Sequence, residues 1–344
     1  MHHGAAHAPR TMGGVTPNDP AAPEPAGGRA SRTSAPHPPS PLPPSPLVPS
    51  PLVPVADGRF TARGVRLLLK RDDLIHPDMP GNKWRKLAPN LSAARAEGAD
   101  TLVTFGGAYS NHLRATAAAG RLLGLATVGV VRGDELARRP LNPSLARCAA
   151  DGMVLRFTDR ATYRRKAEPG ILAALLHDAR AGAGRALGRV YVVPEGGSNA
   201  AAVRGCVELG RELCDEADVV AVAVGTGGTL AGLAAGLPPG RRALGVAALR
   251  GGFLGREVRR LQRDAFGGER GAWSVDDRFH CGGFARSTPE LAAFAAAFEE
   301  EHGISLERTY VAKLLYGLTA MVTAGEFAPG TSVAAVVTGP PDPV

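Results

Sequence analysis

Short apolar runs alternate with amphipathic segments along most of the chain. The apolar runs predict strands at residues 65–70, 101–105, 126–131, 153–157, 190–193, 218–224, 243–248 and 333–337. The segments between them predict helices at about 84–97, 111–123, 143–151, 170–181, 199–216, from 228 onward, 289–303 and 313–324. Nearly every position of the run 218–224 is apolar, which is typical of a strand buried on both faces. The alternation of strands and helices therefore predicts an α/β fold with parallel sheets.

The first part of the chain differs in composition from the rest. Of the 29 prolines, 15 lie in residues 1–55, a stretch that is also rich in Ala, Gly and Ser. Such a segment buries too little apolar surface to offset the entropy of ordering, so we expect a disordered tail over residues 1–45. We expect residues 46–344 to form two α/β lobes with a cleft between them. The large lobe is expected to comprise about 46–95 and 195–344, and the small lobe about 96–194.

Charge and cysteine content exclude several classes of protein. The formal net charge is +8, but arginines such as Arg256, Arg259, Arg260 and Arg263 favour a solvated helix face. A nucleic-acid surface would combine a basic stripe with stacking aromatic residues, and neither is evident. No apolar run reaches the roughly 20 residues of a membrane helix, and the N-terminus has no apolar signal core. The four cysteines show no metal-ligand spacing, so we expect a cytoplasmic protein with free thiols and no metal.

Lysine is rare in this chain, because only five of the 40 basic residues are lysines. Two of the five, Lys83 and Lys86, lie three residues apart in the segment GNKWRK at the start of a predicted helix. At this spacing both side chains share one helix face. A deprotonated lysine amine forms imines, which arginine cannot do, so one lysine is a candidate for covalent chemistry and the other for phosphate binding. The alternative is a pair of surface lysines.

A glycine-rich segment follows the buried run 218–224 and opens a helix. It consists of Gly225, Thr226, Gly227, Gly228 and Thr229. Backbone N–H groups and two hydroxyls at the positive end of a helix favour an anion, most naturally a phosphate. The segment matches neither a Walker loop nor a dinucleotide-binding GxGxxG motif. A tight turn without a ligand is the alternative.

A second helix start, Ser110-Asn111-His112, follows the predicted strand 101–105 and a pair of glycines. A hydroxyl, an amide and free N–H groups at this position suit a small carboxylate. Ser and Asn are also the usual residues at a helix N-cap, and on this segment alone the capping interpretation is favoured.

Taken together, these motifs resemble those of the D-cysteine desulfhydrase and 1-aminocyclopropane-1-carboxylate (ACC) deaminase family of pyridoxal-phosphate (PLP) enzymes. The resemblance runs from about Pro46 to the C-terminus, with order and spacing in agreement. It rests on KRDDL (70–74), GNKWRKL (81–87), TFGGAYSNH (104–112), PEGGSNA (194–200), GTGGTLAG (225–232) and the segment from Tyr310 to Lys313. The family has the tryptophan-synthase β-like fold (PLP fold type II), with the cofactor in the cleft between two α/β lobes.

The resemblance implies how the cofactor would be held. Lys83 would carry PLP through an imine and later move the α-proton of the substrate. Lys86 and the loop from Gly225 to Thr229 would bind the cofactor phosphate. Asn111 would contact the 3′-oxygen of the cofactor, and Thr338 would face its pyridine nitrogen.

It also implies how the substrate would be bound and converted. Ser110, Asn111 and His112 would receive the carboxylate of a small amino acid. Tyr310 would act as an acid, a base or a positioning group. The expected catalytic residues are therefore Lys83, Ser110 and Tyr310, and the family resemblance implies a homodimer.

Several positions depart from the family pattern. The hydroxyl of Thr338 does not keep the pyridine nitrogen protonated, and the weaker electron sink suits β-elimination better than opening of a cyclopropane. Val311 stands where the deaminases have a glutamate, and Phe284 replaces an expected second tyrosine. Pro80 precedes the lysine loop, and Gly339-Pro340-Pro341 replaces a pair of glycines after Thr338.

We therefore expect a PLP-dependent lyase or deaminase that eliminates a β-leaving group from a small amino acid and yields a keto acid and ammonia. D-Cysteine or a related β-substituted amino acid is the first expected substrate. The alternatives are an ACC deaminase, a catalytically weak PLP-binding protein, and a nucleotide-binding protein that uses the glycine loop alone.

Overall fold

The computed structural model describes residues 47–79, 81–181 and 188–339, all of them within the compact unit Pro39–Val344. The predicted disordered tail over 1–45, and the departures at Pro80, Pro340 and Pro341, lie outside the described residues. No helix among the described residues is both long and apolar enough to cross a membrane.

The larger sheet has six strands in the order β1-β2-β10-β7-β8-β9. Their bounds are Leu52–Val55, Arg66–Lys70, Ser332–Val336, Val219–Val224, Arg242–Ala247 and Ala272–Asp276. All neighbours are parallel except the edge strand β1, which pairs antiparallel with β2.

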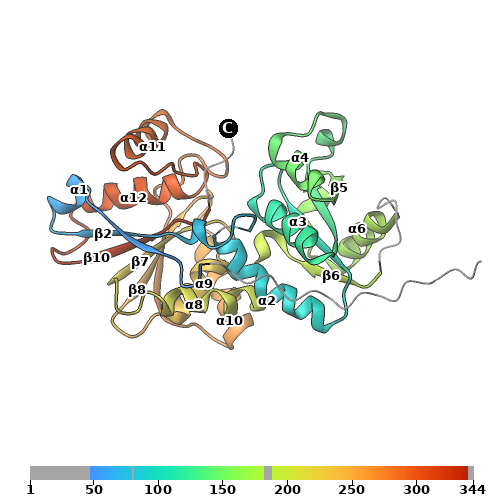
Figure 1. Cartoon of the computed structure of the whole chain (residues 1–344), viewed down its shortest axis with the longest axis horizontal. Coiled ribbons are helices and arrows are strands. Elements are labelled where there is room, and N and C mark those ends of the chain that lie inside the picture. The colour runs from blue at the N-terminus through green and yellow to red at the C-terminus, as the bar shows by residue number, and fades with distance from the viewer. Residues whose placement is uncertain (1–46, 80, 182–187, 340–344) are drawn as a thin grey trace, which may run out of the picture. The chain divides into compact units, whose positions relative to one another are not determined.

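Helices cover both faces of this sheet (Figure 1). One face carries α1 (Gly58–Thr61), α11 (Pro289–His302) and α12 (Val311–Thr323). The other carries α8 (Val207–Arg211), α9 (Gly228–Gly236) and α10 (Leu254–Phe266).

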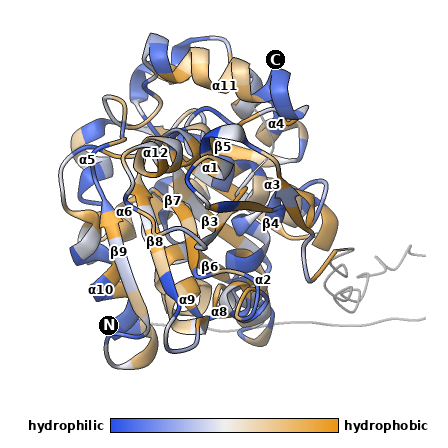
Figure 2. Ribbon diagram, turned by 90° about the vertical axis from the view of Figure 1, so that its left-hand side faces the viewer, coloured by the Kyte–Doolittle hydropathy of each residue, from blue (hydrophilic) through white to orange (hydrophobic). Residues whose placement is uncertain are grey.

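The central strand β7 shows why both faces are covered. Val219, Ala221 and Ala223 pack into the core under α12, whereas the alternate residues Val220, Val222 and Val224 pack under α9. Successive side chains of a strand point to opposite faces, so an apolar run of this kind is buried only between two helix layers. Figure 2 shows the hydrophobic colour along β7 and its neighbour β8. The prediction of a strand buried on both faces is confirmed.

The smaller sheet has four parallel strands in the order β5-β4-β3-β6. Their bounds are Met153–Thr158, Ala126–Arg132, Thr101–Gly106 and Val190–Val193. One face packs against α2 (Asn82–Ala96), α3 (Asn111–Leu123) and α4 (Pro143–Ala150), and the other against α5 (Arg160–Arg164) and α6 (Pro169–Ala181). These strands fall within the predicted small lobe, whose exact boundaries stay a prediction.

Some elements differ from those predicted. The helix expected over 199–216 is two short helices, α7 (Ala200–Gly205) and α8, which break at Cys206. The strands β1 and β9 and the short helices α1 and α5 were not predicted, because each spans only four or five residues. Three 3₁₀ turns, at Asp72–Leu74, Asp134–Arg138 and Glu195–Gly197, complete the described elements. The group of arginines from Arg256 to Arg263 lies exposed on α10, as the solvated-face interpretation predicts.

Candidate active site

A cavity of about 480 Å³ is lined by residues from both sheets. Its walls follow the carboxyl ends of β3, β4, β6, β7 and β10, the edge where ligands bind in open parallel sheets. Gly228 is the one predicted site residue that does not line it. The predicted residues that do are Lys83, Lys86, Ser110, Asn111, His112, Gly225, Thr226, Gly227, Thr229, Tyr310 and Thr338.

Lys83 lies in the first turn of α2 and is partly buried at the cavity. Its Nζ donates a hydrogen bond of 2.6 Å to Oδ1 of Asn82. The pKa of Lys83 falls from its ordinary 10.5 to about 7, because burial penalises the charged form and because the cation of Lys86 is near; the charge of Glu307 acts in the opposite direction. A large fraction of this amine is therefore neutral, and so nucleophilic, at neutral pH.

Lys86 lies one turn further along α2 and is only 3% exposed. Its Nζ donates to the carbonyl of Gly196 at 3.1 Å and to Oγ of Ser198 at 3.0 Å, and lies 3.4 Å from Oγ1 of Thr226. Burial lowers the pKa of Lys86 as well. Within the described ranges no carboxylate pairs with this ammonium, so its charge is available to an anion in the cavity.

Buried charges fix the start of α2, which carries both lysines. Arg85 makes paired hydrogen bonds to Asp72, both of 2.8 Å, and to Glu212, of 2.8 and 2.9 Å. Lys70 lies 2.6 Å from Glu212, and Nζ of Lys70 also donates to the Ser50 carbonyl at 2.6 Å. Such two-pronged guanidinium–carboxylate pairs are geometrically specific. They anchor α2 to the end of β2 and so determine where Lys83 and Lys86 lie.

Gly81, the N-cap of α2, is needed for this approach to the large sheet. Its φ is +68°, a region that other residues rarely adopt, and a Cβ here would collide with the carbonyl group of Thr338. Thr338 follows β10 and is 8% exposed at the cavity. The glycine therefore brings the lysine helix against the residue predicted to face the pyridine nitrogen.

The glycine loop forms the N-terminus of α9 as predicted. Gly227 is the N-cap, with φ +84°, and the Ala231 N–H is bonded back to its carbonyl at 2.9 Å. The N–H groups of the first turn precede that bond and have no partner within the helix. A Cβ on Gly228 would lie 2.7 Å from Oγ of Ser198 and 3.3 Å from Nζ of Lys86, so a side chain there would intrude on Lys86. The loop and the cation together are a candidate site for an anion.

The start of α3 is a capped helix end that also lines the cavity. Ser110 is the N-cap, and its Oγ accepts the N–H of Leu113 at 3.3 Å. The Asn111 side chain accepts a hydrogen bond from Arg114. Capping uses a lone pair of the Ser110 hydroxyl and leaves its hydrogen able to donate. The capping and ligand-binding interpretations of this segment are thus compatible.

His112 is buried, at 1% exposure, between α3 and the small sheet. The hydroxyl of Thr104 donates its hydrogen to the Val193 carbonyl at 2.8 Å. Because that hydrogen is used, the same oxygen accepts the Nε2–H of His112, at 2.7 Å. Nδ1 of His112 then carries the lone pair, and it has no hydrogen-bond partner among the described residues. Burial and the two nearby lysines hold the pKa of His112 well below its usual value, so the ring is neutral.

Tyr310 is the N-cap of α12, and its ring lies against Gly225 of the glycine loop. Burial and the charges of Glu307 and Glu195 raise the pKa of Tyr310, so its hydroxyl stays protonated. The carboxylate of Glu307 accepts the N–H groups of Thr309 and Tyr310 at 2.8 and 2.7 Å. The Phe284 ring is 6.3 Å from that of Tyr310.

Several cavity residues could not be singled out from the sequence. Asn82 contacts Lys83 and donates to Oγ1 of Thr229 at 3.1 Å, a bond between segments far apart in the chain. Ser198 lies within the quoted segment PEGGSNA, but its contact with Lys86 depends on the fold. Glu307 belongs to no motif. Arg132 and Lys166 also line the cavity, and the scarcity of lysine was the one signal that pointed toward Lys166.

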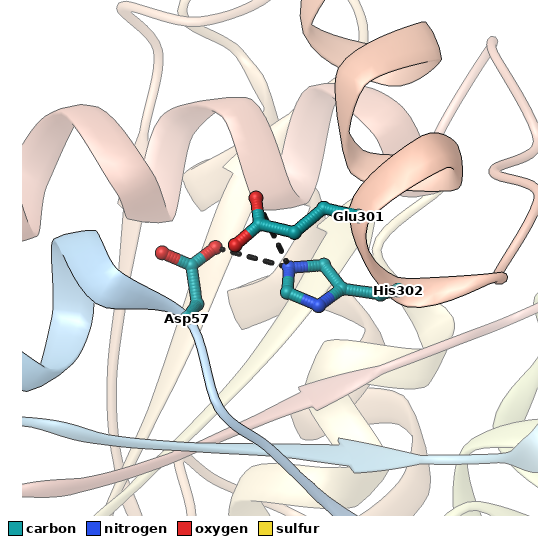
Figure 3. A group of neighbouring side chains, drawn as sticks. All are labelled: Asp57, Glu301 and His302. Carbon is teal, nitrogen blue, oxygen red and sulfur yellow. Dashed lines mark hydrogen bonds and ion pairs between the residues drawn. The ribbon is translucent and has the colours of Figure 1, made fainter.

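One group of potential metal ligands exists among the described residues, and none of its members lines the cavity. It consists of Asp57, Glu301 and His302 (Figure 3). His302 Nε2 lies 3.4 Å from Asp57 and 3.6 Å from Glu301. Both oxygens of Asp57 accept hydrogen bonds from Arg59, so a cation is already paired with this carboxylate. The group fits an ion-pair cluster between α1 and α11.

The fold and the cavity define a class: an α/β protein whose cavity combines a lysine of lowered pKa, a second, buried lysine and a glycine loop at a helix N-terminus. Residues 43–339 match the family described as pyridoxal-phosphate dependent enzyme, and the chain belongs to that family. Its cofactor is PLP.

Two relatives illustrate the similarity. A Pyrococcus horikoshii protein with the provisional name 1-aminocyclopropane-1-carboxylate deaminase is 31% identical over 277 residues, which cover 76% of this chain and 81% of the relative. A D-cysteine desulfhydrase of Klebsiella pneumoniae (strain 342) is 32% identical over 291 residues, with coverage of 77% and 83%.

A solved structure, described as that of an ACC deaminase homologue, has a TM-score of 0.71 and 28% identity, and covers 87% of this chain and 90% of its own. The α/β, tryptophan-synthase β-like fold and the family predicted from the sequence are confirmed.

The residues of the cavity fit PLP. The aldehyde of PLP requires a neutral amine, and Lys83 has a pKa of about 7. Its phosphate requires a cation and backbone N–H groups, and Lys86 lies beside the start of α9 without a carboxylate partner among the described residues. Because Gly228 has no side chain, there is room at this point for both the Lys86 ammonium and a phosphate.

Proposed function

We propose that this protein is a PLP-dependent lyase that removes HX from a small β-substituted amino acid, with D-cysteine as the first substrate, and yields a keto acid and ammonia. The observation that carries the proposal is that Lys83, whose pKa is lowered to about 7, lines the same cavity as Lys86, the glycine loop and the start of α3. The names of the two relatives support an amino-acid substrate.

The cofactor would be held by Lys83 through a covalent bond, by Lys86 and the loop from Gly225 to Thr229 at the phosphate, and by Asn111 and Thr338 at the ring. When bound, PLP supplies an electron sink that makes the α-proton of an amino acid acidic. Lys83 then accepts this proton at Nζ, for which a pKa near 7 is well matched to neutral pH.

The substrate carboxylate would dock at the start of α3. The N–H groups there and the hydroxyl hydrogen of Ser110 are donors at the positive end of the helix. His112 is neutral, its Nε2–H is bonded to Thr104 and its Nδ1 is buried without a hydrogen, so the ring shapes the site and neither supplies charge nor donates to the carboxylate. These groups direct the α-carbon toward Lys83.

Tyr310 lines the cavity and faces the leaving group in this proposal. Its raised pKa keeps the hydroxyl protonated, so it donates a hydrogen bond to the departing thiolate and does not itself give up the proton, because such a phenol is a weaker acid than a thiol. Phe284, at the position where a second tyrosine was expected, has no proton to donate. Phe284 in place of that tyrosine, together with a hydroxyl in place of a carboxylate at Thr338, favours elimination over ring opening of ACC.

The test is a product assay on the PLP-loaded protein. D-Cysteine, L-cysteine and ACC are offered separately, and sulfide, pyruvate, 2-oxobutyrate and ammonia are measured. We expect equal amounts of sulfide, pyruvate and ammonia from D-cysteine, and no product with the Lys83→Ala variant. Release of 2-oxobutyrate from ACC without sulfide from D-cysteine would make the protein a deaminase instead.

Failure to release ammonia from any amino acid would leave a PLP-binding protein without useful catalysis. A homodimer and a cytoplasmic location also remain predictions; sedimentation analysis of the purified full chain tests the first, and fractionation of the source cells tests the second.

A further inference from the structure

Arg132 is a cavity residue to which the proposed function gives no role. It is the last residue of β4, is partly buried and lines the cavity. Its Nη2 lies 3.5 Å from the position that a Cβ on Gly107 would take. Gly107 begins the turn that the Ser110 N–H closes at 3.1 Å. The guanidinium thus lies against the turn that leads into the proposed carboxylate site.

The charge of Arg132 has no carboxylate partner in the part of the chain that the structure describes. Its recorded contact is with the ring of Tyr163, whose centroid is 5.7 Å from the guanidinium carbon. Lys166 lies 4.3 Å from the same ring but pairs with Glu195 at 2.8 Å. Tyr163 is 2% exposed and therefore a rigid support for both cations. Lys166 is neutralised by its partner, whereas Arg132 is not.

The other cations at the cavity are accounted for. Lys83 and Lys86 belong to the proposed cofactor site, and Arg260 pairs with Glu257 at 3.0 Å and with Asp264 at 2.7 Å. A partly desolvated charge is unfavourable until an opposite charge meets it. The planar fork of a guanidinium matches carboxylate, sulfonate and phosphate groups.

We propose that Arg132 forms a subsite for an anionic β-substituent, so that the protein also converts amino acids with a sulfonate or phosphate leaving group on the β-carbon and binds aspartate, whose β-carboxylate cannot leave, as a ligand. The proposal rests on the proposed function, because it assumes that the substrate carboxylate lies at the start of α3. Arg132 is then a specificity-determining residue that lies against the turn from Gly107 to Ser110.

With 3-sulfoalanine the reaction balances without an oxidant. The α-proton passes to Lys83, the C–H electron pair forms the double bond between the α- and β-carbons, and the β-carbon–sulfur bond breaks. Sulfite leaves with the electron pair of the broken carbon–sulfur bond, beside the Arg132 cation. Water then converts the enamine to pyruvate and ammonia.

The first experiment compares two substrates that yield the same keto acid, 3-sulfoalanine and 3-chloroalanine, each as both enantiomers, with the PLP-loaded protein. Arg132→Gln is expected to lower kcat/KM for 3-sulfoalanine about 10–100-fold and to change that for 3-chloroalanine less than about 3-fold, as for the loss of a charge-assisted hydrogen bond. Arg164→Gln, which removes an exposed charge from the neighbouring α5, is the matched control and should change neither. An equal loss for both substrates would show that Arg132 serves a group common to all amino acids and would overturn the proposal.

The second experiment measures binding and needs no turnover. Aspartate and asparagine have the same shape and differ in the charge of the β-substituent. By calorimetry the wild type should bind aspartate about 10–100-fold more tightly, and Arg132→Gln should bind both alike. Equal binding by the wild type would contradict the subsite even if 3-chloroalanine is converted. Tight aspartate binding without conversion of any amino acid would leave the subsite standing while the proposed function fails.

Discussion

The surroundings of Lys83 and of Lys86 differ although the two residues lie three positions apart on one helix. Lys86 contacts three oxygens, from Gly196, Ser198 and Thr226. Lys83 donates to the one oxygen of Asn82 and is partly buried, whereas Lys86 is buried. Burial lowers the pKa of both, but at Lys83 the cation of Lys86 adds to the effect.

The difference assigns separate tasks to two residues of the same type. A lysine held among hydroxyls and a carbonyl keeps a fixed position and serves as a point charge for an anion. A lysine with one amide partner and a pKa of about 7 is able to react as a neutral amine and to exchange protons. The environment, and not the residue type, distinguishes the covalent group from the phosphate ligand.

The largest effect should come from removing the reactive amine. Lys83→Ala is expected to lower keto-acid formation at least about 10³-fold, because both the covalent attachment and the proton acceptor are lost. Steady-state assays at saturating PLP measure this effect. Circular dichroism on the same variant separates a loss of chemistry from a loss of folding, and activity within 10-fold of the wild type would exclude Lys83 as the covalent residue.

The next largest effect should come from the anchor that holds both lysines in place. Arg85→Met leaves the buried carboxylates of Asp72 and Glu212 without their guanidinium and should reduce the free energy of unfolding by about 3–5 kcal/mol. Denaturant titration of the PLP-free protein measures it. Arg165→Met, which breaks the exposed pair with Glu168, is the control and should cost at most about 1 kcal/mol.

Lys86→Met should act on binding more than on chemistry. We expect the dissociation constant of PLP to rise about 10–100-fold, with most of the activity restored by excess cofactor. The same change removes a neighbouring positive charge, so the pKa of Lys83 should rise. Fluorescence titration with PLP gives the affinity; an activity loss that excess PLP does not repair would place Lys86 in the chemistry.

The smallest effect is a shift of a pH profile. Below its pKa the Lys83 amine is protonated and cannot attack an aldehyde, so the rate of PLP capture by the PLP-free protein should rise with pH and level off above about pH 7. Stopped-flow absorbance between pH 5.5 and 9.5 measures the rate. In Lys86→Met the midpoint should lie higher, whereas a rate that still climbs steeply at pH 9 in the wild type would mean an ordinary lysine.

Much of the fold and most of the site could be predicted because the signals are local. The run 218–224 and the glycines after it predicted β7 and the start of α9 from neighbouring residues alone. The scarcity of lysine singled out Lys83 and Lys86. Contacts between residues far apart in the sequence, such as Asn82 with Thr229 and Lys86 with Ser198, could not be predicted, because no local pattern indicates them.

The errors have the same origin. The expected helix 199–216 breaks at Cys206, next to Gly205, where a Cβ would collide with the carbonyl of Arg85 in α2. Nothing in the local sequence indicates that α2 passes there. The sequence likewise could not indicate that Arg132 has no carboxylate partner among the described residues, because this depends on which charged side chains lie near one another in the fold.

The assignment of the covalent bond to Lys83 is the central claim, and chemical trapping tests it most directly. The PLP-loaded protein is reduced with borohydride, digested, and analysed by fragment-ion mass spectrometry, which distinguishes Lys83 from Lys86 within one peptide. We predict a phosphopyridoxyl group on Lys83 and an unmodified Lys86. The label on Lys86, or no labelled lysine at all, would contradict the roles that the two environments assign.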